Sequence, residues 1–141
     1  MVVIGLALAA SGCTLDLSAP AEPAPLDRAE AQAYLDALQT AQRSALDLWA
    51  RLIAGDDVPC EQAIPLPAPP EGRASTTQSE QVLAQLSAAR AALEQSATRW
   101  DLECASESAI VGLEAARVGQ DAARRATEPL QAAQALLATW R

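Results

Sequence analysis

The chain has 141 residues and a formal net charge of −8, from ten Arg against eighteen acidic residues, with no Lys and no His. That length corresponds to one domain of ordinary size. The absence of His excludes Ser-His-Asp and Cys-His catalysis and removes the commonest metal ligand. The acidic balance disfavours nucleic acid, because binding to phosphates needs clustered basic side chains. We therefore expect neither an enzyme nor a nucleic-acid-binding protein.

Half of the residues are hydrophobic, but 34 of them are Ala and only 3% of the chain is aromatic. Most of the apolar content is therefore small. Such a composition predicts a thin core between closely packed helices.

The chain opens with an apolar run that leads into small residues and a cysteine. Residues 2–10 read VVIGLALAA, and Ser, Gly and Cys13 follow. This pattern resembles the lipobox of bacterial lipoproteins, with Ala10 at the position usually held by Leu. The resemblance implies that residues 1–12 are a signal peptide that is cut off and that Cys13 is the lipidated residue.

Two details of this run bear on that interpretation. Signal peptides normally open with Lys or Arg, and residues 1–12 carry no charge, so we expect the natural chain to begin upstream of Met1. A buried N-terminal helix or another kind of membrane anchor is the alternative, although the run is far shorter than the ~20 residues that span a bilayer. In enteric lipoproteins an Asp after the Cys retains the protein in the inner membrane. Thr14 therefore favours the outer membrane or the cell surface.

A proline-rich stretch follows the cysteine. Three prolines lie between residues 20 and 25, which favours an extended polyproline conformation over a helix. We expect residues 13–26 to form a tether with a reach of ~40 Å. The tether would join the lipid to a helical domain at residues 27–141.

The first helix is expected between Asp27 and Gly55. Asp27 is a good N-cap that forms a capping box with Glu30, and Gly55 is in the favoured position just past the end. Apolar residues recur three and four positions apart, which places them on one helix face. Gln42 is the only polar residue in this row, which comprises Ala31, Leu35, Leu38, Gln42, Ala45, Trp49 and Leu52.

The second helix is expected to open with a capping box between Thr77 and Glu80. A turn is expected at residues 105–108, because an unbroken helix from Thr77 to Ala126 would be ~75 Å long, too long for this domain. The apolar row of this helix comprises Val82, Leu86, Ala89, Leu93, Ala97, Trp100 and Cys104.

The third helix is expected from about Glu107 to Trp140, with a kink or break near Pro129 that would divide it in two. Its core row comprises Ile110, Leu113, Ala116, Ala123, Leu130 and Leu137. A row of small residues beside it, Gly112, Gly119, Ala126 and Ala133, would let a neighbouring backbone approach closely, although an Ala-rich chain also produces such rows by chance. No segment alternates like a strand. The fold class is therefore all-α, a small bundle of three or four helices.

Cys60 and Cys104 remain as a pair once Cys13 is assigned to the lipid. In an exported protein an even pair is expected to form a disulfide, and two buried free thiols are the alternative. Two Cys without His leave too few ligands for zinc. The acidic residues Asp56, Asp57 and Glu61 lack the spacing of a calcium loop. We therefore expect no metal and no cofactor.

The expected disulfide constrains how the helices are arranged. Cys60 follows the first helix and Cys104 ends the second, and bonded cysteines have Cα atoms within about 7 Å of each other. An antiparallel hairpin would separate these two ends by ~40 Å. Residues 61–76 include four prolines and reach ~50 Å when extended. The sequence therefore predicts that this segment crosses the bundle lengthwise, with Ile64 and Leu66 packed on the helices, and that the first two helices run parallel.

Together these features predict a lipid-anchored protein of the cell envelope, attached outside the cytoplasmic membrane through its N-terminal lipid. Its bundle is expected to act as an interaction or structural module for an envelope protein partner. The alternative is a small-molecule or ion-binding lipoprotein, with a cleft between helices that is lined by the tryptophans. The missing catalytic motifs leave an enzyme as the weakest hypothesis.

Overall fold

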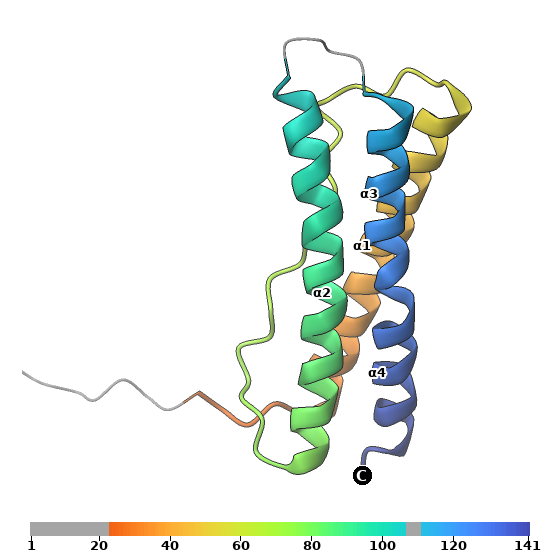
Figure 1. Cartoon of the computed structure of the whole chain (residues 1–141). Helices are drawn as coiled ribbons and strands as arrows, with labels where there is room; N and C mark the ends of the chain where they lie inside the picture. The colour runs from red at the N-terminus through yellow and green to blue at the C-terminus, as the bar shows by residue number, and fades with distance from the viewer. Residues whose placement is uncertain (1–22, 107–110) are drawn as a thin grey trace, which may run out of the picture.

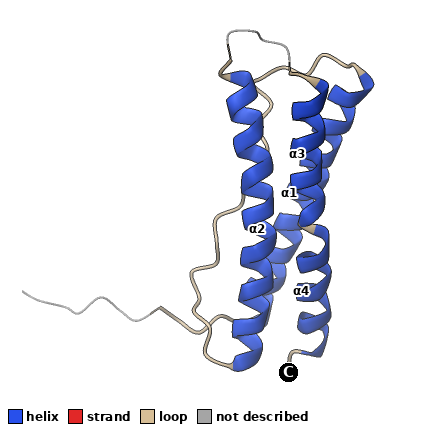
Figure 2. Cartoon of the chain, viewed as in Figure 1, coloured by secondary structure: helices blue, strands red, loops and turns tan. Residues whose placement is uncertain are grey.

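The computed structural model describes residues 23–106 and 111–141, which form an elongated bundle of helices (Figure 1, Figure 2). Its elements are α1 (Arg28–Ala54), α2 (Thr77–Cys104), α3 (Leu113–Arg125) and α4 (Thr127–Thr139). Within those residues the only β pairing is an isolated bridge between Pro25 and Arg73. The expected all-α bundle is confirmed, with three long helical segments in four pieces.

The first two helices run parallel, and α3 and α4 return in the opposite direction (Figure 1). Residues 60–76, which we call the crossing segment, run lengthwise from the end of α1 back to the start of α2. Ile64 is buried and Leu66 is half-buried against the core. The predicted parallel helices and lengthwise crossing are therefore confirmed. We call the end of the bundle at Cys60 and Cys104 the disulfide end and the opposite end the terminal end.

The core is continuous from one end of the bundle to the other. The predicted rows of α1 and α2 are buried, apart from Gln42 at mid-row and Leu52 and Cys104 at the row ends, which are half-buried. Trp49 and Trp100 are its largest side chains, and their rings meet edge to face with centroids 5.7 Å apart. These two indoles supply much of the volume that an Ala-rich chain otherwise lacks.

A buried chain of hydrogen bonds joins three helices beside these indoles. The Trp49 Nε1–H donates to Ser96 Oγ at 2.8 Å, and the Ser96 hydroxyl donates to the Gly119 carbonyl at 2.9 Å. A Cβ at position 119 would lie 2.3 Å from the Trp49 ring, so this position requires glycine. The predicted row of small residues thus allows close approach along most of its length. Gly119, Ala126 and Ala133 are buried, and only Gly112 is exposed.

The starts of α1 and α2 differ in detail from the expected capping boxes. Asp27 caps α1 as expected, but the Glu30 carboxylate accepts a hydrogen bond from the Gly72 N–H of the crossing segment, at 3.1 Å. The cap of α2 is Thr76, one residue earlier than expected, and Ser79 rather than Glu80 completes its box. The first expectation was wrong because the Gly72 N–H, which lies outside the helix, takes the Glu30 carboxylate. The second was wrong by one residue, because Thr76 has the same capping side chain as Thr77.

The third helical segment begins later than expected. α3 starts at Leu113 rather than near Glu107, and Leu113 is 51% exposed instead of lying in the core. Burial begins less than one turn further along, at Ala115 and Ala116. The first turn of α3 lies at the disulfide end, where the bundle stops (Figure 1). Ile110, also predicted for the core, is outside the described residues.

The break in this segment falls at Ala126, close to the predicted position. Pro129 has no N–H to donate to the carbonyl four residues earlier, so the helical ladder is interrupted there. The Gln42 amide of α1 donates to the Ala123 carbonyl at 3.1 Å and to the Thr127 hydroxyl at 2.9 Å. The one polar residue in the apolar row of α1 thus satisfies polar groups at the break in its neighbour.

Candidate functional site

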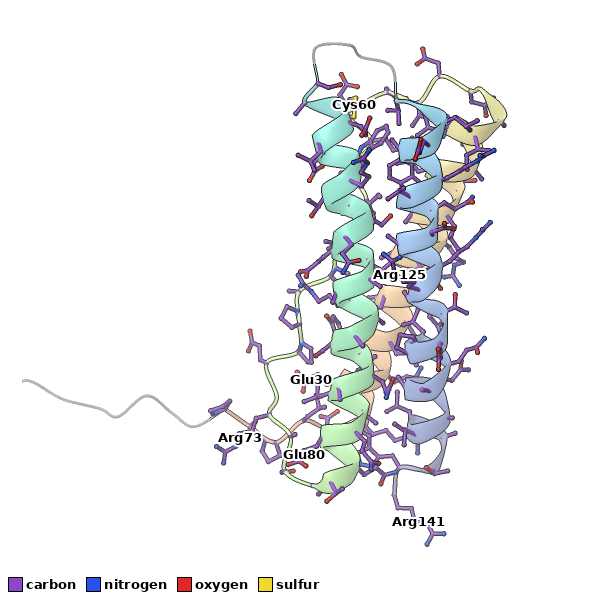
Figure 3. The ribbon with its side chains drawn as sticks, viewed as in Figure 1. Glu30, Cys60, Arg73, Glu80, Arg125 and Arg141 are labelled. Atoms are coloured by element: carbon purple, nitrogen blue, oxygen red, sulfur yellow. A yellow bond between two sulfur atoms is a disulfide. The ribbon has the colours of Figure 1, made fainter. Side chains whose placement is uncertain are left out.

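Cys60 and Cys104 form a disulfide, with their Cα atoms 5.6 Å apart (Figure 3). The bond joins the start of the crossing segment to the end of α2. The expected pairing is confirmed, and the alternative of two free thiols is wrong. Cys13, the candidate for lipidation, is outside the described residues.

The tryptophans do not line a cleft as the alternative function required. Trp49 and Trp100 are enclosed in the core, with 0% and 1% of their surface exposed. Trp140 is half-buried at the terminal end, where its carbonyl accepts a hydrogen bond from Arg28 Nη1 at 3.3 Å. Three cavities that the described residues form lie along the crossing segment and at the disulfide end, and none of the three is lined by a tryptophan.

One cavity of about 280 Å³ lies between the crossing segment and α2, with Tyr34 of α1 in its wall. We call it the Tyr34 cavity. Pro69 and Pro70 line it from the crossing segment, and Leu83 and Ala91 line it from α2. Its wall therefore combines apolar surface with polar groups from α1 and α2.

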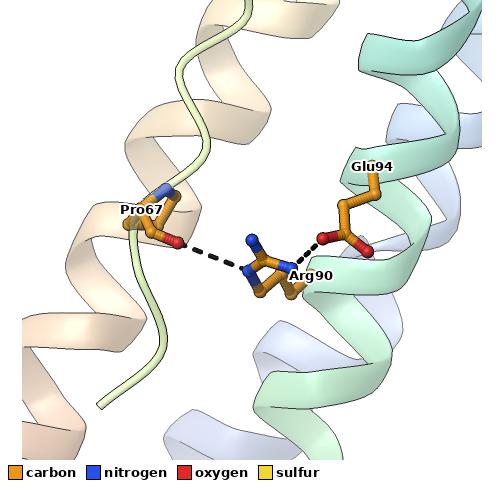
Figure 4. Close-up of polar contacts among 3 residues, drawn as sticks. All are labelled: Pro67, Arg90 and Glu94. Carbon is orange, nitrogen blue, oxygen red and sulfur yellow. Dashed lines mark hydrogen bonds and ion pairs between the residues drawn. The ribbon is translucent and has the colours of Figure 1, made fainter. Parts of the chain in front are cut away.

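Arg90 is the central polar residue of this cavity. Its Nε–H donates to the Pro67 carbonyl at 3.4 Å, and its Nη1 pairs with Glu94 one turn further along α2 (Figure 4). The first contact fastens the crossing segment to α2. The second neutralises the guanidinium, and because both side chains are partly exposed, the pair adds little stability.

Tyr34 is the buried polar residue of this cavity. Only 7% of its surface is exposed, and its hydroxyl has no hydrogen-bond partner among the described residues. Burial raises the pKa of Tyr34 above its ordinary value, and the nearby Arg90 guanidinium acts weakly in the opposite direction. The phenol is therefore protonated at neutral pH and has a proton to donate.

Two further cavities lie beside the crossing segment and at the disulfide end. One of about 400 Å³ lies on the other side of the crossing segment, between Leu66 and Thr40 of α1, and is mostly apolar. Another of about 240 Å³ at the disulfide end includes Asp56 and Asp57. Within residues 23–106 and 111–141, no group of three or more Cys, Asp or Glu is placed to hold a metal ion.

The large apolar side chains that remain exposed in the described parts of the chain lie toward the disulfide end. Leu102 is near the end of α2 and is 61% exposed, and Leu113 and Val118 are in the first half of α3 and are each 51% exposed. No helix of the described regions is both long and apolar enough to cross a membrane.

The chain enters the bundle at the terminal end. The Leu26 N–H donates to the Arg73 carbonyl at 2.8 Å, and the Arg73 N–H donates to the Ala24 carbonyl at 3.0 Å. Leu26 itself is buried. The segment that follows the predicted tether is thus fastened to the crossing segment, at the end of the bundle opposite the disulfide (Figure 1).

The sequence analysis did not single out the groups that line the Tyr34 cavity. Tyr34 directly precedes Leu35 of the core row and is the only tyrosine in the chain, which was the one available signal. Arg90 and Glu94 are four residues apart, which is also the spacing of an ordinary ion pair on a helix surface. No protein-family model, curated protein or solved structure matches this chain.

Proposed function

We propose that this protein is a lipid-anchored module of the cell envelope that presents the disulfide end of its bundle to a protein partner. The observation that carries the proposal is that the chain's entry point and its exposed apolar side chains lie toward opposite ends of the bundle. The chain enters at the terminal end through the Leu26–Arg73 pairing, and the exposed apolar side chains lie toward the other end.

The length of the bundle sets the distance between these two ends. α1 has 27 residues and is therefore ~40 Å long. With a lipid on Cys13, the terminal end would face the membrane and the disulfide end would stand ~40 Å further out. A single exposed Leu is unremarkable, but Leu102, Leu113 and Val118 all lie on the same side of the midpoint of the bundle, which favours a binding surface there.

The disulfide supports the proposed location in the cell envelope. Disulfides persist in oxidising compartments and are rare in the cytosol. The Cys60–Cys104 bond therefore agrees with export, which the lipobox-like run ending at Cys13 also predicts.

The anchor is tested by Cys13→Ser, which removes the sulfur that would carry the lipid. We expect the variant to leave the washed membrane fraction, while the adjacent control Thr14→Ser stays there. Retention of Cys13→Ser in the membrane fraction, at the level of the control, would exclude a lipid on this residue.

The partner surface is tested by placing a photo-crosslinking amino acid at position 102 or 113 of the otherwise unchanged chain in intact cells. Position 80 is the matched control, because Glu80 is exposed on the same helix as Leu102 but at the terminal end (Figure 3). We expect a discrete protein adduct from positions 102 and 113 and none from position 80. Equal adducts from both ends, or none from positions 102 and 113, would contradict the proposed presentation.

A further inference from the structure

We propose that the Tyr34 cavity binds a small uncharged molecule in which a hydrogen-bond acceptor, such as an amide carbonyl, is attached to an apolar body. The inference is independent of the lipid anchor and of any protein partner. It rests on the polar groups that the cavity leaves without partners and on the character of its walls.

The first unpartnered group is the phenol of Tyr34. Buried hydroxyls are nearly always hydrogen-bonded, because an unsatisfied buried donor retains its full desolvation penalty. The hydroxyl of Tyr34 has no partner among the described residues, although only 7% of the residue's surface is exposed. The hydroxyl oxygen itself is buried, so an acceptor in the cavity would supply the missing partner after a small rotation of the Tyr34 side chain.

The second unpartnered group belongs to Arg90. Its Nε and Nη1 are occupied by the Pro67 carbonyl and by Glu94, and its Nη2 makes no hydrogen bond to the described residues. The cavity therefore offers donors from two helices, Tyr34 of α1 and Arg90 of α2. Hydrogen-bond donors in the wall of a cavity select a group with acceptor lone pairs.

The charge of the site favours an uncharged acceptor over an anion. Glu94 already neutralises the Arg90 guanidinium, and the whole chain carries a net charge of −8. A carboxylate or phosphate would have to displace Glu94 and would be repelled by it, whereas a carbonyl oxygen accepts the same hydrogen bonds without a net charge.

The walls define the rest of the ligand. Pro69, Pro70, Leu83 and Ala91 present apolar surface, and a volume of about 280 Å³ is at the small end of ligand pockets. The body of the ligand is therefore about the size of one ring. The proline wall is held by the disulfide, by the Arg90 contact and by the Leu26–Arg73 pairing, so the site needs little ordering on binding.

The experiment uses three probes of one size: benzamide, which has an uncharged acceptor; benzoate, which has a charged one; and toluene, which has none. Each is titrated into the isotope-labelled full-length chain, and the amide shifts are followed by NMR. We expect benzamide to shift Gly72, Ser87 and Arg90 and to bind at least fivefold more tightly than either of the other probes.

Two variants locate the binding. Tyr34→Phe removes only the hydroxyl, which has no partner among the described residues, so the fold should be kept, and benzamide should bind at least fivefold more weakly. Ala91→Leu adds volume at an exposed helical position in the cavity wall and should abolish the shifts. The proposal is overturned if benzamide binds no better than toluene, if benzoate binds more tightly, or if Tyr34→Phe binds benzamide as well as the natural chain.

Discussion

The two halves of the bundle are held together by different means. In the half next to the disulfide, Trp49 and Trp100 fill the core, and Gly119 lets α3 approach the Trp49 ring closely. In the terminal half the partners of α1 and α2 include the crossing segment, which leaves the Tyr34 cavity along its side. The first half has the two indoles at its centre and a cavity of about 240 Å³ at its outer end, and the second half has the Tyr34 cavity beside extended chain.

This difference shows how an Ala-rich sequence distributes a small amount of side-chain volume. Two large indoles on neighbouring helices fill one half. Their rings meet edge to face, and the Trp49 ring also packs against Gly119 and donates to the buried Ser96 hydroxyl. The other half has no tryptophan in its interior, and an extended proline segment covers its surface. Buried polar atoms without a partner among the described residues occur in both halves: Arg99 Nε and Trp100 Nε1 in the half next to the disulfide, and the Tyr34 hydroxyl beside the crossing segment.

The largest expected effect comes from the covalent link in the better-packed half. Replacing both cysteines, Cys60→Ser with Cys104→Ser, opens a loop whose ends are 44 residues apart. The chain-entropy model predicts a loss of about 4 kcal/mol in the free energy of unfolding, which urea denaturation would measure. A loss below about 1 kcal/mol would mean that core packing alone orders this half.

The next effect tests the contact between Gly119 and Trp49. Gly119→Ala gains about 1 kcal/mol of helix propensity, but its Cβ would lie 2.3 Å from a fully buried indole. Overpacking a core typically costs ~1–3 kcal/mol. We therefore expect the free energy of unfolding to fall by about 1–2 kcal/mol, as measured by thermal or urea unfolding.

A double-mutant cycle isolates this contact. In a Trp49→Leu background the ring is gone, so adding Gly119→Ala should become neutral or stabilising. An equal loss in both backgrounds would show that Gly119 is needed for a reason other than the indole.

A smaller and more local effect is expected in the terminal half. A Cβ at Gly72 would lie 2.6 Å from both the Leu26 Cα and the Glu30 carboxylate. We expect Gly72→Ala to cost about 1 kcal/mol and to speed hydrogen exchange at the Leu26 and Arg73 amides, which bond across this contact.

The control for that substitution is Glu30→Gln, which keeps an acceptor for the Gly72 N–H and should leave the same amides protected. Exchange measured by NMR would separate the halves. Faster exchange around Trp49 in the Gly72→Ala variant would contradict their independence.

The smallest effect concerns ionisation of the only tyrosine. Because burial raises the pKa of Tyr34, its absorbance titration should have a midpoint above ~10 in the folded chain and return to ~10 in urea. A raised pKa means that the folded state holds the proton more tightly. This contribution to stability is therefore fully present below about pH 10 and is lost as pH rises through the folded value.

Urea unfolding of the natural chain and of Tyr34→Phe on either side of this range would test the assignment. The variant should be about as stable as the natural chain at neutral pH and should lack the alkaline loss that Tyr34 causes. A folded midpoint at or below ~10 would contradict a buried phenol.

The sequence predicted the features that depend on local pattern. The apolar rows of α1 and α2, the Asp27 cap, the Gly55 end and the break near Pro129 all follow from helical periodicity and from the backbone chemistry of Gly and Pro. The parallel course of α1 and α2 was also predictable, because a disulfide sets an upper limit on one distance and chain length sets the reach of the segment that must satisfy it.

Only the tertiary structure decided which distant groups meet. The Glu30 carboxylate accepts from the Gly72 N–H rather than from its own helix end, and the Gln42 amide donates at the break in another helical segment. Leu113 remains exposed because none of the described helices covers it. The Tyr34 cavity likewise exists only because α1, α2 and the crossing segment lie at particular separations. Periodicity assigns a residue to a face, but it carries no information on what stands opposite that face, and that is why these contacts could not be predicted.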